Sequence, residues 1–71
     1  MKVGIYQHYK GNLYKVLCIA KHSETEDELV VYQALYGKYE HWVRPITMFN
    51  EEIEVEGKFV KRFTYIPTTN F

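Results

Sequence analysis

The stretch from residue 13 to residue 36 decides the fold, because it contains two long apolar runs, LYKVLCIA at residues 13–20 and LVVYQALY at residues 29–36. Both runs are rich in β-branched, aromatic and other apolar residues, and both lack glycine and proline, a composition typical of strands. A loop rich in acidic residues separates them. We therefore expect one long hairpin on which the rest of the chain packs.

Regular strand alternation assigns the two faces of this hairpin. The interior face is predicted to carry Tyr14, Val16, Cys18, Ala20, Val30, Tyr32 and Ala34. The opposite face carries an apolar surplus, made of Leu17, Ile19, Val31 and Leu35. Either the bend of a barrel or a partner has to cover this surplus. In the loop, the spacing of Ser23 and Glu26 matches a capping box and predicts a single helical turn over residues 25–28.

Shorter patterned segments flank the hairpin. Residues 5–9 form a short strand, and residues 41–44 form another that Pro45 stops. The five residues after this strand, 46–50, are too few for a strand pair and predict one helical turn.

The C-terminal part predicts a second, smaller hairpin. Residues 52–56 alternate polar and apolar side chains, and residues 59–66 form the last strand. Glu56 and Gly57 suit a two-residue turn between them. Residues 68–71 are expected to fray. Five to six short strands with one helical turn predict a single all-β domain over residues 1–71, a small SH3-like barrel or roll, with an OB-like barrel as the alternative.

The composition is that of an ordinary small globular chain without net charge. Nine basic and nine acidic side chains cancel, which argues against tight non-specific binding to nucleic-acid backbones but leaves room for a local basic patch. Cys18 is the only cysteine, so an internal disulfide is impossible and nothing indicates an oxidising compartment. No apolar stretch is long enough for a signal peptide or a membrane span. We expect a cytoplasmic location and no membrane partner.

The three histidines, His8, His22 and His41, show no metal-ligand spacing, so we expect no metal and no cofactor. The run of His22, Ser23 and Glu24 contains the residue types of a hydrolase, but neighbours in sequence rarely converge as nucleophile, base and orienting group. A hydrolytic or small-molecule-binding domain would instead need His8, His22 and Glu24 to meet in one pocket.

Trp42 and Arg44 form a better constellation with the tyrosines. They are two residues apart, so on a strand both face the same way. Aromatic rings beside an arginine can stack a base, a planar ligand or a proline of a peptide. The candidate binding residues are Tyr32, Tyr36, Trp42 and Arg44, with His8 and His22 at the rim. No catalytic residue is predicted.

The chain resembles a small bacterial family, the domain of unknown function numbered 1653. The resemblance covers residues 6–66 and rests on HYKG at 8–11, Tyr14, Val16, HSET at 22–25, ELVVY at 28–32, ALY at 34–36, WVRP at 42–45, Met48, Phe49, Val55, Gly57 and Phe63. It implies an SH3-type barrel without an assigned activity. The matching polar residues are His8, Lys10, His22, Ser23, Glu24, Thr25, Glu28 and Arg44. They are candidates for a surface that the family shares, or they supply the polar contacts that the turns and strand pairs of the fold need.

The leading hypothesis is a non-enzymatic binding module with an aromatic and arginine-lined groove. Its ligand would be a peptide, a protein partner or single-stranded nucleic acid. One alternative is the hydrolytic or small-molecule domain with a histidine and glutamate rim. Another is a structural homo-oligomer, or a weak homodimer, in which the apolar surplus of the hairpin is buried between copies.

Overall fold

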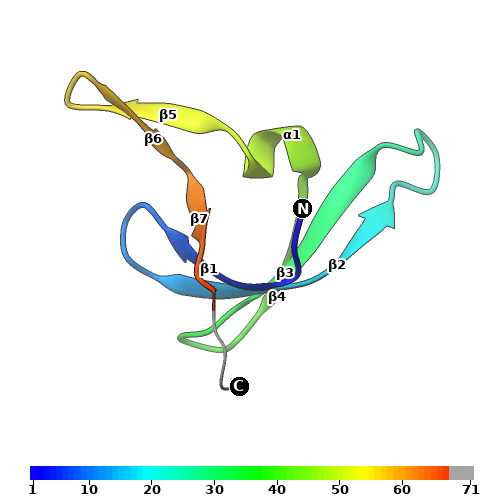
Figure 1. Cartoon of the computed structure of the whole chain (residues 1–71). Coiled ribbons are helices and arrows are strands. Elements are labelled where there is room, and N and C mark those ends of the chain that lie inside the picture. Colours follow the sequence, from blue (N-terminus) through cyan, green and yellow to red (C-terminus); the bar gives the residue numbers. More distant parts are fainter. Residues whose placement is uncertain (68–71) are drawn as a thin grey trace.

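The computed structural model describes residues 1–67, and these residues form mainly antiparallel strands. The elements in chain order are β1 (Gly4–His8), β2 (Leu13–Lys21), β3 (Glu28–Ala34), β4 (His41–Pro45), α1 (Ile46–Phe49), β5 (Glu52–Val55), β6 (Lys58–Lys61) and β7 (Phe63–Tyr65). Five strands form a sheet in the order β4-β3-β2-β1-β7, and β5 and β6 form a separate hairpin. α1 lies between the arm of β6 and β7 and the arm of the β2–β3 hairpin (Figure 1). The prediction of a small all-β, barrel-like fold with one helical turn is confirmed.

A β-bulge in β2 reverses the faces predicted for the second half of this strand. Val16 pairs with Tyr32, but Cys18 rather than Leu17 forms the next pair with β3. Because strand side chains alternate, this extra residue turns Cys18 outward and Ile19 inward. Cys18 is exposed and Ile19 packs against the core. The interior position expected for Cys18 and the surplus position expected for Ile19 are therefore both wrong.

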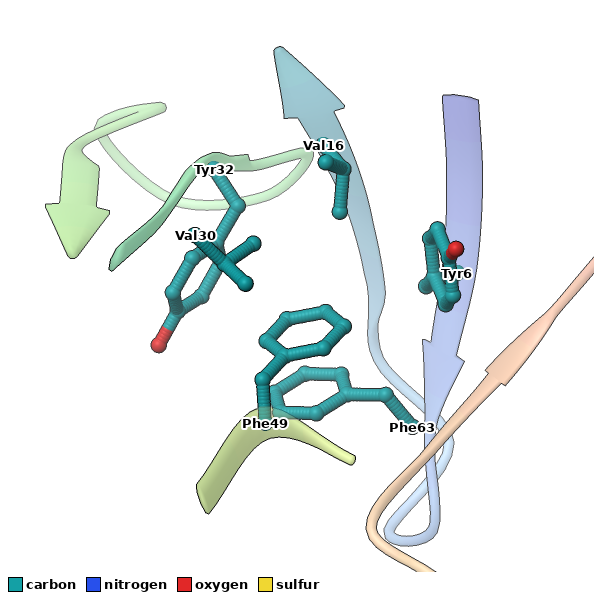
Figure 2. Packing of buried hydrophobic residues seen from close by; sticks show 6 residues of the cluster. All are labelled: Tyr6, Val16, Val30, Tyr32, Phe49 and Phe63. Atoms are coloured by element: carbon teal, nitrogen blue, oxygen red, sulfur yellow. The ribbon is translucent and has the colours of Figure 1, made fainter. Parts of the chain in front are cut away.

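An aromatic cluster fills the space between the sheet and α1 (Figure 2). Phe49 of α1 stacks on Phe63 of β7 with ring centroids 4.1 Å apart. Tyr6 and Tyr32 meet the Phe49 ring edge-on, at 5.4 Å each. The buried cluster comprises Tyr6, Val16, Val30, Tyr32, Phe49 and Phe63. Large rings bury much apolar area per residue, which a chain of this size needs to form a core.

The segment predicted as one last strand is divided at Arg62. β6 pairs with β5, whereas β7 pairs with β1. The Arg62 N–H donates to the carbonyl of Glu51 at 3.0 Å, and the Arg62 carbonyl accepts from the N–H of Tyr9 at 3.0 Å. These two hydrogen bonds fix Arg62 between the small hairpin and the large sheet. Because the last predicted strand is divided there into β6 and β7, residues 1–67 contain seven strands rather than five or six.

The turn at Glu56 and Gly57 forms as predicted. Val55 pairs with Lys58, and the two turn residues have φ angles of 51° and 79°. Two positive φ angles define the type I′ turn, whose twist matches that of the flanking strands. Residues 68–71, which were expected to fray, lie outside the described residues.

The outer face of the sheet retains part of the predicted apolar surplus. Leu17 is exposed, whereas Val31 and Leu35 are half-buried. Val43 of the edge strand β4 pairs with Val31 and extends this face, with 61% of its surface exposed.

Candidate functional site

Four of the six predicted site residues line one hollow at the end of the β3–β4 pair where the turn joins the two strands. Tyr14, Tyr32, Tyr36, Trp42 and Arg44 surround a volume of about 230 Å³, which we call the aromatic hollow. The structure thus brings Tyr32, Tyr36, Trp42 and Arg44 together.

The register of β3 and β4 explains why these side chains meet. Tyr32 lies opposite Trp42, and Val30 lies opposite Arg44. Strand side chains two residues apart point to the same face, so Trp42 and Arg44 both face the inner side of the roll. Tyr32 is 5% exposed because inner rings cover it, whereas Trp42 is 50% exposed because β4 is the last strand of the sheet. The floor of the hollow is thus buried and its rim is open.

Tyr14 also lines the hollow. The sequence placed it on a strand next to those of Tyr32 and Tyr36, but it was not among the candidate binding residues. It pairs with Ala34, and this small neighbour leaves space for the Tyr14 ring to reach Tyr36. Their hydroxyls are 2.7 Å apart, and their rings meet edge-on at 5.5 Å. Burial, together with the hydrogen bond to Tyr36, raises the pKa of Tyr14 to about 12. Tyr14 therefore stays neutral at physiological pH and joins β2 to the β3–β4 turn. A small residue opposite a tyrosine in the hairpin was the sequence signal for this contact.

Arg44 brings a positive charge to the hollow. Its side chain is half-buried, and its guanidinium carbon lies 5.9 Å from the centre of the Phe63 ring. In the part of the chain that the structure describes, the one ion pair joins Arg62 to Glu51 at 3.4 Å. Arg44 thus has no carboxylate partner within residues 1–67, and its guanidinium is free to donate hydrogen bonds to an anion.

A second hollow adjoins the first and shares Tyr36 and Trp42 with it. Its volume is about 190 Å³, and its lining is Ala34, Tyr36, Gly37, Lys38, Glu40 and Trp42. The β3–β4 turn that forms its wall is fixed by two hydrogen bonds. The Tyr39 N–H donates to the Tyr36 carbonyl at 3.1 Å, and the Gln33 side-chain amide donates to the Tyr39 carbonyl at 3.0 Å. Together the two hollows leave Trp42 and Tyr36 accessible from both sides.

His8 lies beside the aromatic hollow without lining it. Its ring centroid is 5.0 Å from that of Phe63 and 6.2 Å from that of Tyr14. Its Nδ1 accepts a hydrogen bond from the N–H of Lys10 at 3.2 Å, so a neutral His8 carries its proton on Nε2. Burial lowers the pKa of His8, and the nearby charges of Arg62, Lys10 and Arg44 lower it further. Four basic groups therefore lie close together at this end of the sheet.

His22 lies at the opposite end of β2, so the structure does not bring it to the hollow. Between it and His8 runs the nine-residue strand β2, which at ~3.3 Å per residue is about 30 Å long. The Nδ1 of His22 accepts hydrogen bonds from the N–H groups of Glu24 at 3.1 Å and Thr25 at 3.3 Å. His22 therefore organises the β2–β3 loop.

The β2–β3 loop also differs from its predicted conformation. The expected capping box and helical turn over residues 25–28 do not form, because His22 takes the capping role predicted for Ser23 and β3 begins at Glu28. His8, His22 and Glu24 do not converge, so the pocket that the hydrolytic alternative required is not formed by these residues. Within residues 1–67, no three His, Cys, Asp or Glu side chains gather closely enough to hold a metal ion. None of the helices in this range is both long and apolar enough to span a membrane.

Comparison with known proteins identifies the family. Residues 4–65 match the model of a family described as "Protein of unknown function (DUF1653)". The chain is also similar to a crystal structure of a DUF1653 protein from Bordetella bronchiseptica, with 30% sequence identity and a TM-score of 0.87 over 99% of this chain and 92% of that chain. No curated protein matches the chain. The chain therefore belongs to the DUF1653 family.

Proposed function

We propose that the chain is a non-enzymatic binding module whose aromatic hollow receives a planar ligand group beside a negative charge. The observation that carries the proposal is the position of Arg44, a half-buried arginine without a carboxylate partner in residues 1–67, next to four aromatic side chains. Attraction between this cation and an anion is stronger in such partly desolvated surroundings than in open water. Trp42 adds an exposed ring on which a planar group can stack.

The charge of Arg44 argues for an anionic ligand over a cationic one. Aromatic cages without a basic lining residue attract ammonium groups through the negative faces of their rings. Arg44 would repel such a group, and the other basic groups near His8 would add to this repulsion. Ligands that combine rings or apolar groups with negative charge fit better: a segment of an acidic peptide or protein, or single-stranded nucleic acid.

Three small probes of matched shape test this proposal. We expect phenyl phosphate to shift the indole N–H signal of Trp42 in NMR spectra at lower concentration than benzyl alcohol or benzylamine, because it alone carries negative charge. Arg44→Gln is expected to remove the preference, whereas Lys58→Gln, which changes a lysine of β6, is the matched control and should retain it. Equal shifts by the three probes, or a preference for benzylamine, would refute the proposal.

The setting we propose is the bacterial cytoplasm. The thiol of Cys18 is exposed, and an exposed unpaired thiol is compatible with a reducing compartment. A structure from Bordetella bronchiseptica covers nearly the whole chain, which supports a bacterial origin.

A second candidate function is weak self-association through the outer face of the sheet. Leu17 of β2 and Val43 of β4 are exposed, and β4 is an edge strand of the sheet. Light scattering across a concentration series tests it. A mass that rises with concentration and returns to the monomer value in Val43→Lys is expected. A constant monomer mass would remove this candidate.

A further inference from the structure

We infer that the ligand of the aromatic hollow is single-stranded nucleic acid, an inference that rests on the proposed function. The hollow is one end of a longer row of rings at the same end of the sheet. This aromatic stripe consists of Tyr9, His8, Tyr14, Tyr36 and Trp42. Successive ring centroids are 4.5 Å apart for Tyr9 and His8, 6.2 Å for His8 and Tyr14, and 5.5 Å for Tyr14 and Tyr36.

The aromatic stripe consists of two half-buried supporting rings and three exposed rings. His8 and Tyr14 are half-buried and fixed by their hydrogen bonds to Lys10 and Tyr36. Tyr9, Tyr36 and Trp42 are 40%, 44% and 50% exposed. Each exposed ring can stack one unpaired base, since every base has a π face. The stripe therefore suits about three bases, the number that the sheet of an RNA-recognition domain stacks.

Basic groups follow the aromatic stripe and supply contacts for phosphates. The Nζ of Lys10 lies 5.8 Å from the centre of the Tyr9 ring, at one end of the stripe. Arg44 lines the hollow at the other end, and Lys38 lines the adjoining hollow. Glu40 also lines that second hollow and disfavours a phosphate there. The path from Lys10 to Arg44 is therefore the favourable one for a phosphate backbone.

A row of rings with a cation at each end distinguishes a nucleic-acid strand from the other ligand classes. Each unit of a single strand carries a base and a phosphate, so one strand can stack on the exposed rings and also reach Lys10 and Arg44. An acidic peptide can satisfy Arg44, but it does not repeat a flat ring beside each negative charge. Duplexes keep their bases stacked inside, and a chain with zero net charge lacks the broad basic surface that duplex backbones require.

Fluorescence anisotropy with a labelled oligothymidylate of about eight nucleotides tests this inference. We expect Trp42→Ala to weaken binding by about 5–150-fold, the range for loss of one base–aromatic stack, and Trp42→Phe to restore most of it. Phe59→Ala is the matched control, because Phe59 is 70% exposed on β6, outside both hollows and the stripe. Urea unfolding of each variant establishes that the fold is retained.

Salt dependence provides the second readout. Two phosphate contacts, at Lys10 and Arg44, predict a slope of log K against log salt near about −1.4, and Arg44→Gln should reduce its magnitude by about 0.7. Lys58→Gln should leave the slope unchanged. An excess of unlabelled duplex should not compete.

Each possible failure has a different meaning. If phenyl phosphate shifts the Trp42 indole signal but the oligonucleotide does not bind, the inference is overturned and the proposed function stands. The same conclusion follows if an acidic, proline-containing peptide saturates the hollow at a concentration at which the oligonucleotide is unbound. Binding that Trp42→Ala and Phe59→Ala weaken equally would also overturn the inference. If neither phenyl phosphate nor the oligonucleotide binds, both proposals fall.

Discussion

The bulge in β2 predicts that two adjacent residues, Cys18 and Ile19, differ sharply in their contribution to stability. Ile19 packs against the core while remaining partly accessible, whereas Cys18 is exposed. Truncating a fully buried isoleucine to alanine costs about 2–5 kcal/mol, so a half-buried one should cost about 1–2.5 kcal/mol. Cys18→Ala removes an exposed sulfur and should change the free energy of unfolding by less than about 0.5 kcal/mol.

These differences are large relative to the stability of the whole chain. At ~0.05–0.15 kcal/mol per residue, a chain of 71 residues has a free energy of unfolding of about 4–11 kcal/mol. Ile19→Ala should therefore lower Tm by about 4–20 °C, since 1 kcal/mol shifts a domain of this size by about 4–8 °C. Urea unfolding followed by circular dichroism measures both variants, with an unchanged m-value as evidence that they share the unfolding reaction of the parent chain.

Thiol labelling of the native protein provides an independent measurement of the same feature. With an exposed thiol at Cys18, dithionitrobenzoate should react with the folded chain within about tenfold of its rate with the unfolded chain. An interior thiol would react only after local unfolding exposed it, so its labelling rate would be lower by about a thousandfold or more. Strong protection, or a larger loss of stability in Cys18→Ala than in Ile19→Ala, would refute the placement of the bulge.

Three further predictions concern the core, a turn and a histidine. Phe49→Ala should lower the free energy of unfolding, measured by urea titration, by about 3–5 kcal/mol. The reason is that Phe49 is 1% exposed and packs α1 against the sheet. Met48→Ala, at an exposed neighbour, should lower it by less than about 1 kcal/mol. Gly57→Ala should destabilise the chain by about 1 kcal/mol and Gly57→Asn by less, because the φ of 79° is unfavourable for alanine while no atom lies near the added Cβ. The folded-state pKa of His8 is lowered, so the unfolded state binds more protons there. The contribution of His8 to stability should be complete above its unfolded-state pKa of about 6.5 and should be lost as the pH falls from there through the folded-state pKa. Urea midpoints measured between about pH 7.5 and about pH 5 should fall less in His8→Asn than in the parent chain.

The sequence predicted those parts of the fold that local chemistry determines. The long hairpin follows from two uninterrupted strand-forming runs, and the turn at Glu56 and Gly57 follows from the freedom of glycine at positive φ. Pro45 ended β4 as expected, since proline cannot donate a ladder hydrogen bond. The hollow was predictable in part, because the period of a strand is enough to place Trp42 and Arg44 on one face.

The features that the sequence did not predict depend on contacts between distant residues. Nothing at Leu17 marks a bulge, since neither glycine nor proline stands there and both possible registers bury apolar side chains. The loop contained a recognisable capping box, but the Nδ1 of His22 accepts hydrogen bonds from the N–H groups of Glu24 and Thr25. The N–H of Glu26, which Ser23 was expected to bind, donates to the His22 carbonyl instead. Arg62 divided the last strand because Tyr9 and Glu51 engage its backbone, and neither partner is near it in sequence.

In the aromatic hollow, two side chains occupy positions that do not favour the stability of the fold. A chain of 71 residues has little core, and burying its one tryptophan would strengthen that core. Trp42 instead remains half exposed on an edge strand, beside an arginine that is partly desolvated without a carboxylate partner in residues 1–67. A single exposed apolar side chain needs no explanation, but an exposed tryptophan and an unpaired half-buried cation on the same hollow both cost stability. Local losses of stability of this kind are expected at binding sites. A bound ligand there can cover the exposed ring and place a negative charge beside the arginine.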